Sequence, residues 1–588
     1  MIARCLIRNP HTDDWLDFDT PVDVLVATEL TDVVPLLRNL ESRVEQEHLH
    51  AVGFICYEAA PAFDPALTTR PPDQLPLLAF GLFHSPAVIP DHQLPDACQA
   101  IPAHWQLEGN QEDHATDIAS IRAAIADGSV YQINHTLRLS AADVDPWSLF
   151  RNIAGDADYA AYIDTDAFAI VSASPELFFD LDGDRLTCMP MKGTASRGVT
   201  TAADRKQSDW LARSEKNRAE NLMITDMVRN DLGRIAISGS VETTNLFKVQ
   251  RHPTVWQMTS TVSCQTHASI CEIFANLFPG ASITGAPKNA SMRMIRKLET
   301  QTRGIYTGAI GYLQPGRRAR FSIAIRTARV DKPDQRASYG AGGGIVWDSD
   351  PEGEFEELLS KTQILKDRPR RNTFQLLETL LWQPGSGYVL LEEHLQRLAG
   401  SASYFDFDCK SADVRQQLAE YSTRLHDSDY RIRLLVDRAG LVTIESQPLT
   451  KTPEIIVPAQ IYPEPVDVTD PMLYHKTSYR VLYDRALAWA KAGHEALLIN
   501  PNGFITESTI ANLVYEMDGV LYTPPISSGL LPGTFRASLL EAGRIAERAL
   551  HRSELARCAH FWLINSLRGW RQAQFAHPDL DASLQRPD

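Results

Sequence analysis

Three glutamates occur at positions where they could hold a divalent cation. Glu354 and Glu357 are three residues apart in PEGEFEELLSK, so a helix would place both carboxylates on the same face. Glu220 lies in a second long segment with helical character, ENLMITDMVRNDLG. Carboxylate oxygens are the ligands that Mg²⁺ prefers, and bound Mg²⁺ often bridges to an anionic substrate. Glu220, Glu354 and Glu357 could therefore hold Mg²⁺, although a single glutamate on a helix is more often simply solvated.

Two helices are expected to position these carboxylates. One is predicted from Asp204 to Leu232, with Gly233 suited to the left-handed position after its last turn. The other should begin near residues 349–351, where Asp350 suits the N-cap and Pro351 the first turn. Glycines in ITGAPK (283–288) and GAGGG (340–344) would let the backbone approach a ligand closely.

The bulk composition limits the classes of protein. The chain has 588 residues, more than one domain usually holds, and 44% of them are hydrophobic. A net charge of −17 disfavours binding to nucleic acid through phosphate contacts. The eight cysteines form no CxxC pair, which disfavours a disulfide framework or a cysteine-rich zinc site and favours a reducing cytoplasm. We see no secretory signal and no run of roughly 20 apolar residues that could span a membrane.

The polar, basic segment KDRPRRN, ending at residue 372, divides the chain. Short β-rich runs precede it, such as AAYI, FAIVSA and LFFDLD. After it a strand (FQLLETLLW), a turn (PGSG), a strand (YVLL) and a helix (EEHLQRL) indicate a new domain. We therefore predict an α+β protein with a first domain at 1–366, a linker at 367–371 and a second domain at 372–588.

The first domain carries a set of longer motifs. They are YQIN (131–134), SASPELFF (172–179), PMKGTASRG (190–198), RAENLMITDMVRNDLGR (218–234), ASITGAPK (281–288), YTGAIGY (306–312), FSIAIRT (321–327) and GAGGGIVWDSDPEGEFEELLSK (340–361). Together they resemble the chorismate-utilising enzymes: anthranilate synthase component I, aminodeoxychorismate synthase component I, and the isochorismate and salicylate synthases. The resemblance covers most of residues 1–365 and implies large, mainly antiparallel sheets with a Mg²⁺-dependent chorismate site. It implies substrate binding by Gln132, Thr194, Thr284, Gly285, Tyr306, Arg326, Gly342 and Gly343, with Arg326 and the metal facing the two carboxylates of chorismate.

Two positions discriminate among these enzymes. Lys192 in PMKGT is alanine in anthranilate synthases and lysine in aminodeoxychorismate synthases, which implies that Lys192 attacks the chorismate ring before ammonia displaces it. Glu176 in SASPE matches the general acid that helps the 4-hydroxyl leave. Gln132 stands where isochorismate and salicylate synthases place a water-activating lysine, and an amide cannot be that base. Amination is therefore favoured over addition of water.

Two further observations concern a residue that differs from the family's usual one and the source of ammonia. Gln257 appears where the family usually has a histidine linked to pyruvate elimination in anthranilate synthases. This fits an enzyme that stops at aminodeoxychorismate. None of the eight cysteines has the Gly-x-Cys-x-Gly setting of a class I glutaminase, so we expect a separate glutaminase subunit to supply ammonia.

The second domain resembles the fold-type IV pyridoxal-phosphate enzymes, which include branched-chain and D-amino acid aminotransferases and aminodeoxychorismate lyase. The motifs are EEHLQRL (392–398), YHKTSYR (474–480), GFITESTIANLVYEMDGVLYTPP (503–525) and LLPGTFRASLLEAGRIAE (530–547). The resemblance implies a two-subdomain fold, often dimeric, in which Lys476 binds pyridoxal phosphate covalently and Glu507 pairs with its ring nitrogen. The LPGTFR turn is expected to lead into a helix, ASLLEAGRIAERAL (537–550), whose N-terminus would bind the phosphate with Gly533 and Thr534. Arg397 and Ser566 would also contact the phosphate.

The second domain's own residues leave lyase and aminotransferase open, because one site runs both chemistries. The fusion favours a lyase, since pyruvate elimination follows chorismate amination on the way to 4-aminobenzoate. The alternative is an anthranilate synthase joined to an amino acid aminotransferase. A third hypothesis makes one half a degenerate scaffold that binds a glutaminase or an effector. No nucleic-acid or membrane partner is expected.

Overall fold

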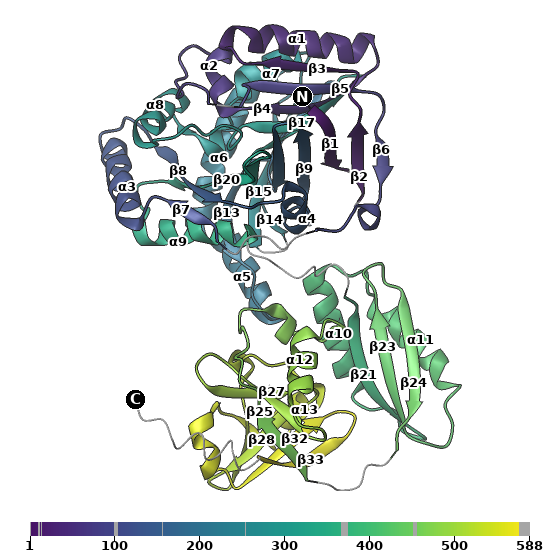
Figure 1. Cartoon of the computed structure of the whole chain (residues 1–588). Coiled ribbons are helices and arrows are strands. Elements are labelled where there is room, and N and C mark those ends of the chain that lie inside the picture. Colours follow the sequence, from purple (N-terminus) through teal and green to yellow (C-terminus); the bar gives the residue numbers. More distant parts are fainter. Residues whose placement is uncertain are drawn as a thin grey trace. The chain divides into compact units, whose positions relative to one another are not determined.

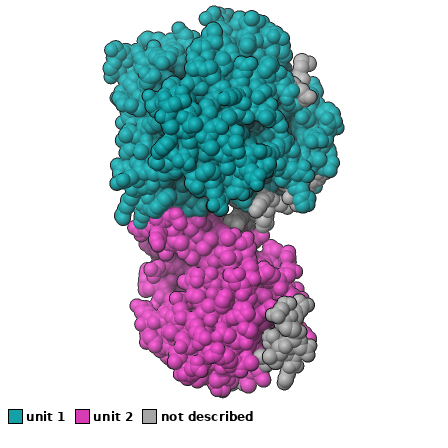
Figure 2. All heavy atoms as spheres, turned by 90° about the vertical axis from the view of Figure 1, so that its left-hand side faces the viewer, with its two compact units in different colours: residues 1–196, 208–369 teal, residues 197–207, 370–588 magenta. Residues whose placement is uncertain are grey.

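The computed structural model describes residues 2–9, 12, 14–73, 75–98, 104–155, 157–252, 255–365, 374–450 and 456–575 (Figure 1). The chain forms two compact units, one of residues 1–196 and 208–369, the other of residues 197–207 and 370–588 (Figure 2). The linker predicted at 367–371 lies outside the described residues. In the described part of the chain, no helix is both long and apolar enough to cross a bilayer.

The described residues of the first unit contain two sheets of ten strands, paired antiparallel throughout. The first sheet runs in the order β16 (Gly285–Ala286), β8 (Gln132–Ala141), β20 (Arg336–Ile345), β19 (Thr327–Asp331), β10 (Phe168–Ser174), β9 (Tyr159–Thr165), β1 (Ile2–Arg8), β2 (Trp15–Asp19), β6 (Ala87–Ile89), with β7 (Gln106–Glu108) also paired to β8. The second runs in the order β13 (Met191–Ser196), β15 (Val255–Gln265), β12 (Arg185–Cys188), β11 (Leu177–Asp182), β18 (Arg318–Ile323), β17 (Ala309–Gln314), β4 (His50–Ile55), β5 (Leu78–Phe83), β3 (Asp23–Ala27), with β14 (Glu242–Arg251) also paired to β15.

Side chains alternate between the two faces of these strands, and this alternation builds separate cores. On β1, Cys5 and Ile7 enter a cluster that also contains Phe54 of β4 and Tyr312 of β17, so this cluster lies between the two sheets. Leu6 points the other way, into a cluster under the helices of the first sheet. The sheets therefore stack face to face, and helices cover their outer faces.

The helices of the first unit surround this sandwich (Figure 1). They are α1 (Leu30–Gln46), α2 (Ala60–Phe63), α3 (Gln111–Ala126), α4 (Pro146–Ile153), α6 (Glu215–Gly233), α7 (Ile270–Leu277), α8 (Lys288–Leu298) and α9 (Pro351–Thr362). Helix α5 (Thr201–Arg213) begins in the second unit and ends in the first. The prediction for α9 is confirmed, because Asp350 is its N-cap and accepts a hydrogen bond from the Gly353 N–H at 2.9 Å.

The single helix predicted over residues 204–232 is wrong, because α5 and α6 divide at Ser214. The Ser214 hydroxyl accepts a hydrogen bond from the Asn217 N–H and so starts a new helix. Gly233 is the last residue of α6 and has no positive φ; the C-cap is Arg234 with φ −75°. The left-handed cap predicted at Gly233 is therefore also wrong.

The described residues of the second unit hold a four-stranded and a nine-stranded sheet. The small sheet is β22 (Gly387–Tyr388), β21 (Leu376–Gln383), β23 (Tyr430–Val436), β24 (Val442–Pro448), and it packs against α10 (Leu391–Phe405) and α11 (Ser411–Ser422). The large sheet is β30 (Ala546–Glu547), β29 (Val520–Thr523), β28 (Asn512–Met517), β32 (His560–Asn565), β33 (Gly569–Phe575), β25 (Val457–Ile461), β26 (Glu495–Ile499), β27 (Phe504–Ser508), β31 (Leu550–His551). Pairing of β28 with β27 closes six of these strands into a ring, beside α12 (Val481–Trp489) and α13 (Thr534–Glu541).

The predicted α+β class is confirmed in both units, with mainly antiparallel sheets in the first and two subdomains in the second. Two local predictions in the second unit are too long. The strand predicted at YVLL is cut to β22 because Leu390 adopts φ 54°, and the helix predicted from ASLLEAGRIAERAL ends at Glu541 ahead of Gly543, with φ 65°.

Candidate active sites

Two nitrogen-bearing side chains from different sheets meet over Gly344 of β20. A Cβ built on Gly344 would lie 2.4 Å from Gln132 Nε2 and 2.6 Å from Lys192 Nζ. Lys192 lies on β13 and is half-buried, and Gln132 lies on β8. Only glycine leaves room for both, although the sequence prediction had named its neighbours Gly342 and Gly343 instead. The lysine is thus held against the sheet that carries the glutamine.

Gln132 is a buried amide that nothing in the described chain satisfies. It is 1% exposed, and neither Nε2 nor Oε1 has a hydrogen-bond partner. A buried amide normally finds partners, so its free atoms indicate a ligand site. On the same side, Thr194 donates a hydrogen bond to Gln257 Oε1 at 3.1 Å, which fixes the residue at the family's histidine position.

Glu176 is a buried carboxyl group that is influenced by the charge of Lys192. It is 4% exposed and accepts a hydrogen bond from the Ser282 hydroxyl at 2.7 Å. Burial raises the pKa of Glu176 to about 7, although Ser282 and the charge of Lys192 oppose the shift. A carboxyl group with this pKa can carry a proton at neutral pH and give it to a leaving group. Ser282 was not predicted, although it lies within the ASITGAPK motif.

The three predicted metal ligands interact electrostatically across two helices. Burial raises the pKa of both Glu220 on α6 and Glu354 on α9, and the charge of Glu357 adds to each shift. Lys361 lowers the pKa of Glu357 through an ion pair of 2.9 Å. Lys361 also donates to the Gly342 carbonyl at 2.7 Å, and the Ser349 hydroxyl donates to Glu354 at 2.7 Å.

Arg326 is a cation without an anionic partner. Burial lowers the pKa of its guanidinium, and no carboxylate is among the groups that shift it. No hydrogen bond or ion pair joins its side chain to the residues that the structure describes, and its backbone adopts φ 50°, uncommon outside glycine. A partly buried, unpaired guanidinium of this kind suits a carboxylate of the substrate.

The other predicted substrate residues surround the same end of β8. Burial raises the pKa of Tyr306 to about 12, and its ring covers Gly340 of β20. Gly285, with φ 137°, lies where a Cβ would be 2.1 Å from the Gln132 carbonyl. The Thr284 hydroxyl donates to the Gly280 carbonyl at 2.9 Å, so this side chain is used within its own turn.

In the second unit, one cavity of about 680 Å³ gathers all six predicted cofactor residues. Its lining contains Arg397, Lys476, Glu507, Gly533, Thr534 and Ser566. Burial, with Arg397 and Arg480 nearby, lowers the pKa of Lys476 to about 8. Burial raises the pKa of Glu507 to about 7, while hydrogen bonds from the Leu531 N–H and the Tyr483 hydroxyl oppose the shift.

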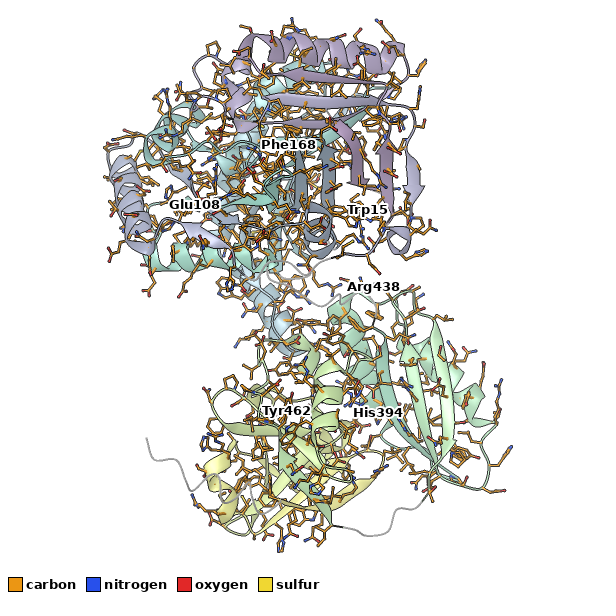
Figure 3. The ribbon with its side chains drawn as sticks, viewed as in Figure 1. Trp15, Glu108, Phe168, His394, Arg438 and Tyr462 are labelled. Carbon is orange, nitrogen blue, oxygen red and sulfur yellow. The ribbon has the colours of Figure 1, made fainter. Side chains whose placement is uncertain are left out.

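The predicted phosphate residues are held by two side chains that were not predicted, Glu378 and His394. Arg397 donates two hydrogen bonds to Glu378, at 2.9 and 2.6 Å. His394 of α10, labelled in Figure 3, lies 2.7 Å from Glu378 through Nδ1, while Nε2 faces the hydroxyls of Ser566 at 3.0 Å and Thr534 at 3.3 Å. Burial opposes the charge of Glu378, but Arg397 and His394 lower its pKa to about 2. The signal available in the sequence was HLQRL, which places His394 and Arg397 one turn apart.

The cavity is strongly positive at its rim, which the sequence did not reveal. Its lining includes Arg431 and Arg433 on β23, Arg480 and Arg568, whereas Glu507 is the one carboxylate among its described lining residues. Arg431 and Arg433 alternate with buried residues, so both project from the same face of the small sheet. These arginines suit a substrate with more than one negative charge.

Comparison with known proteins identifies the family to which the first unit is similar. Residues 4–367 match the family described as chorismate binding enzyme. The chain belongs to this family. Aminodeoxychorismate synthase component 1 of Salmonella typhimurium is 38% identical over 262 residues, which cover 44% of this chain and 57% of that protein. Anthranilate synthase component 1 1 of Haloarcula marismortui is 37% identical over 268 residues, covering 45% of this chain and 54% of that protein.

This member of the chorismate-binding enzymes thus spans little more than half the length of the curated relatives it matches. A crystal structure of anthranilate synthase component I from Streptococcus pneumoniae has a TM-score of 0.52 and 23% identity, covering 62% of this chain and 93% of that one, and it supports the fold. Residues 375–574 match the family described as amino-transferase class IV. The predicted order of a chorismate-binding fold followed by a fold-type IV domain is confirmed.

The class IV domain implies pyridoxal phosphate, and the cavity fits it. Lys476 lies in the cavity lining with its pKa lowered, and Glu507 is a buried carboxylate in the same lining. Gly533 starts α13 without a side-chain cap, so the first N–H groups of that helix are open to an anion. Gly533 also has no room for a Cβ, which would lie 2.0 Å from Asn512 Oδ1.

The family implies Mg²⁺ for the first unit, and the carboxylates of the three predicted glutamates are oxygen donors of the kind that Mg²⁺ binds. No three acidic, histidine or cysteine side chains of the described residues converge as a ready-made metal site. Mg²⁺ usually takes one or two protein carboxylates and completes its shell with water and substrate oxygens. Glu220, Glu354 and Glu357 are therefore sufficient donors for a metal held together with an anionic substrate.

Proposed function

We propose that the chain makes 4-aminobenzoate in two steps. The unit with domain limits 1–366 would convert chorismate and ammonia to 4-amino-4-deoxychorismate, and the unit at 372–588 would eliminate pyruvate from that product. The observation that carries the proposal is the meeting of Lys192 and an unpartnered Gln132 over Gly344. This arrangement offers a nucleophilic amine and no base for water. The aminodeoxychorismate synthase relative from Salmonella supports the same chemistry.

The amination follows from the positions of these side chains. Arg326 binds one carboxylate of chorismate, and Glu220, Glu354 and Glu357 would hold Mg²⁺ at the other, where it neutralises charge. Lys192 Nζ attacks the ring, forming a C–N bond while the C4–O bond breaks. Glu176 donates its proton to the departing hydroxyl, which leaves as water. Ammonia then attacks C4, and the bond to Lys192 breaks as the electrons return to the amine.

The source of ammonia is proposed to be a separate glutaminase. The relative from Salmonella is named component 1, which is in keeping with a second component. The eight cysteines of this chain include none in a Gly-x-Cys-x-Gly setting. Ammonium salts should replace the partner in an assay at high concentration.

The second step uses the arginine-rich cavity. Aminodeoxychorismate carries two carboxylates, which the rim arginines would bind. Pyridoxal phosphate, when bound, supplies an electron sink next to the substrate amine. Lys476, whose pKa is lowered to about 8, can take a proton from the ring and give it to the departing enolpyruvyl group, which leaves as pyruvate. Glu507 holds the proton of the pyridine nitrogen.

The test is product analysis with the full chain. Chorismate, an ammonium salt, Mg²⁺ and pyridoxal phosphate should yield 4-aminobenzoate. Lys192→Ala should stop amination but still convert added aminodeoxychorismate. Lys476→Ala should lose the absorbance of the covalently bound cofactor and accumulate aminodeoxychorismate. Formation of 2-aminobenzoate would favour an anthranilate synthase joined to an aminotransferase, and no aminobenzoate of either kind would refute the proposal.

A further inference from the structure

A small cavity borders Glu176, and its lining contains none of the residues predicted to bind the substrate. Its volume is about 30 Å³, and its lining includes Glu176, Ser282, Cys188 and Asp231. One water needs about 10–15 Å³ of such volume, so the cavity has room for about two. The other lining residues are mostly apolar, among them Ile224, Val228, Leu277 and Ile323.

The two carboxylates that line this cavity differ in their access to solvent. Glu176 is 4% exposed, so solvent cannot reach it directly. The Asp231 side chain on α6 is 13% exposed, and Lys288 Nζ lies 3.5 Å from its Oδ2. Burial raises the pKa of Asp231, while Lys288 and Arg234 oppose the shift. Asp231 can therefore exchange protons with solvent more readily than Glu176.

The charges around this path are few. Lys192 faces Glu176, Lys288 and Arg234 face Asp231, and Asp64 faces Lys288. Cys188 is the remaining titratable group of the described lining, and burial raises the pKa of its thiol far above neutrality. Glu176 and Asp231 are therefore the two groups of the described lining that can exchange a proton near neutral pH.

We propose that water in this cavity connects Glu176 to Asp231 and that Asp231 returns a proton from solvent to Glu176 after each amination. This inference rests on the proposed function, in which Glu176 gives its proton to the leaving hydroxyl. The Glu176 carboxylate takes a proton from a cavity water, that water takes one from Asp231, and solvent reloads Asp231. Ammonia loses one proton to solvent on becoming the product amine, so the net reaction consumes none. Asp231 acts through Glu176 and is a positioning residue.

Two variants of the full chain test the relay. Asp231→Asn removes the outer carboxylate, and Cys188→Leu fills the cavity without removing a carboxylate. The matched control is Asp226→Asn, on the same helix, whose side chain is 71% exposed and paired with Arg229. Melting curves check that each variant folds, and added aminodeoxychorismate assays the second unit separately.

We expect both test variants to lower kcat for amination by about tenfold or more, with KM for chorismate unchanged, because proton transfer contributes on the order of 10²–10⁴. The loss should grow above pH 7, the region of the Glu176 pKa, and the kinetic effect of D₂O should increase. Asp226→Asn should behave as the parent protein. An unchanged kcat and pH profile in Asp231→Asn would overturn the relay. A rise in KM for ammonia, with no other change, would also overturn it and would indicate that the cavity is a path for ammonia. If the parent protein itself fails to aminate chorismate, the proposed function falls instead.

Discussion

Lys476 lies in a cavity whose positive charge decides its reactivity. Arg397 and Arg480, together with burial, lower its pKa to about 8, while Glu378 and Glu507 oppose the shift. A lysine in water titrates near 10.4, so this one becomes a neutral amine about two pH units earlier. The cavity thus keeps a nucleophilic amine close to neutral pH.

The first prediction concerns the rate at which cofactor-free protein binds pyridoxal phosphate covalently. Only the neutral amine attacks an aldehyde, so the rate constant should rise about tenfold per pH unit below pH 8 and level off above it. Stopped-flow absorbance measures it. Arg480→Met, which removes one of the cations, should move the midpoint upward. A midpoint near pH 10 in the parent protein would contradict this account.

The second prediction concerns Gln132, whose buried amide has no hydrogen-bond partner among the residues that the structure describes. Leaving a buried polar group unsatisfied costs about 1–3 kcal/mol, so Gln132→Met, which keeps the length and removes the polar atoms, should raise the free energy of unfolding. The same change should raise KM for chorismate by about tenfold, equivalent to about 1.4 kcal/mol. Chemical denaturation and steady-state kinetics measure the two effects. A less stable variant with unchanged KM would show that the amide serves the fold.

At the scale of elements, a helix boundary could be predicted only where a clear local sequence pattern marks it. Asp350 was identified because an N-cap followed by proline is a local pattern, and its hydrogen bond to Gly353 is present. The break at Ser214 was missed because helix-forming residues flank it on both sides. The early end of α13 depends on the left-handed backbone at Gly543, inside a run with helical composition. The sequence alone does not show whether a glycine inside such a run adopts the left-handed conformation.

The residues of the candidate sites also divide into those that a sequence motif identifies and those that only the fold brings together. Residues within long motifs, such as Lys192, Lys476 and Glu507, could be predicted by resemblance. Glu378 and the rim arginines could not, because their importance arises from strands that meet only in the folded second unit. Gly344 could be placed near the site from its motif, but the choice among three adjacent glycines depends on which face of β20 each one presents.

The third prediction tests how α9 positions its carboxylates. Asp350→Ala removes the N-cap hydrogen bond and should lower the free energy of unfolding by about 0.5–2 kcal/mol. Because Glu354 lies in the first turn, the Mg²⁺ concentration for half-maximal amination should also rise. Asp348→Ala is the matched control, an exposed residue in the preceding turn. Equal stability of the two variants would remove Asp350 from this role.

At the scale of the whole molecule, the chain does not divide at one point. The segment Arg197–Gln207 groups with the second unit, although β13 before it carries Lys192 and α6 after it carries Glu220. Arg197 pairs with Asp204 through hydrogen bonds of 2.7 and 2.8 Å, and it donates to the Tyr404 carbonyl at 3.0 Å. The domain boundary predicted near residue 370 did not indicate that Arg197–Gln207 groups with the second unit. A short polar segment has no hydrophobic pattern that shows which core it packs against.

The last prediction concerns what this segment does for the second unit. Arg197 lies over the Tyr404 ring at 4.3 Å, and that ring packs 4.4 Å from His475, the neighbour of Lys476. The side chains of Arg197 and Asp204 are only 8% and 6% exposed, so Arg197→Met removes the cation that faces a buried carboxylate, which would keep its hydrogen bond from the Gly198 N–H. That change should destabilise the second unit by about 3–5 kcal/mol and lower the temperature at which the cofactor absorbance is lost. Adding Asp204→Leu removes the stranded charge and should restore most of the loss, because apolar replacement of a buried ion pair is often neutral. If the single variant melts at the same temperature as the parent protein, the segment contacts the second unit without stabilising it. If the double variant is no more stable than the single variant, the packing of Arg197 against Tyr404 contributes more to stability than the ion pair does.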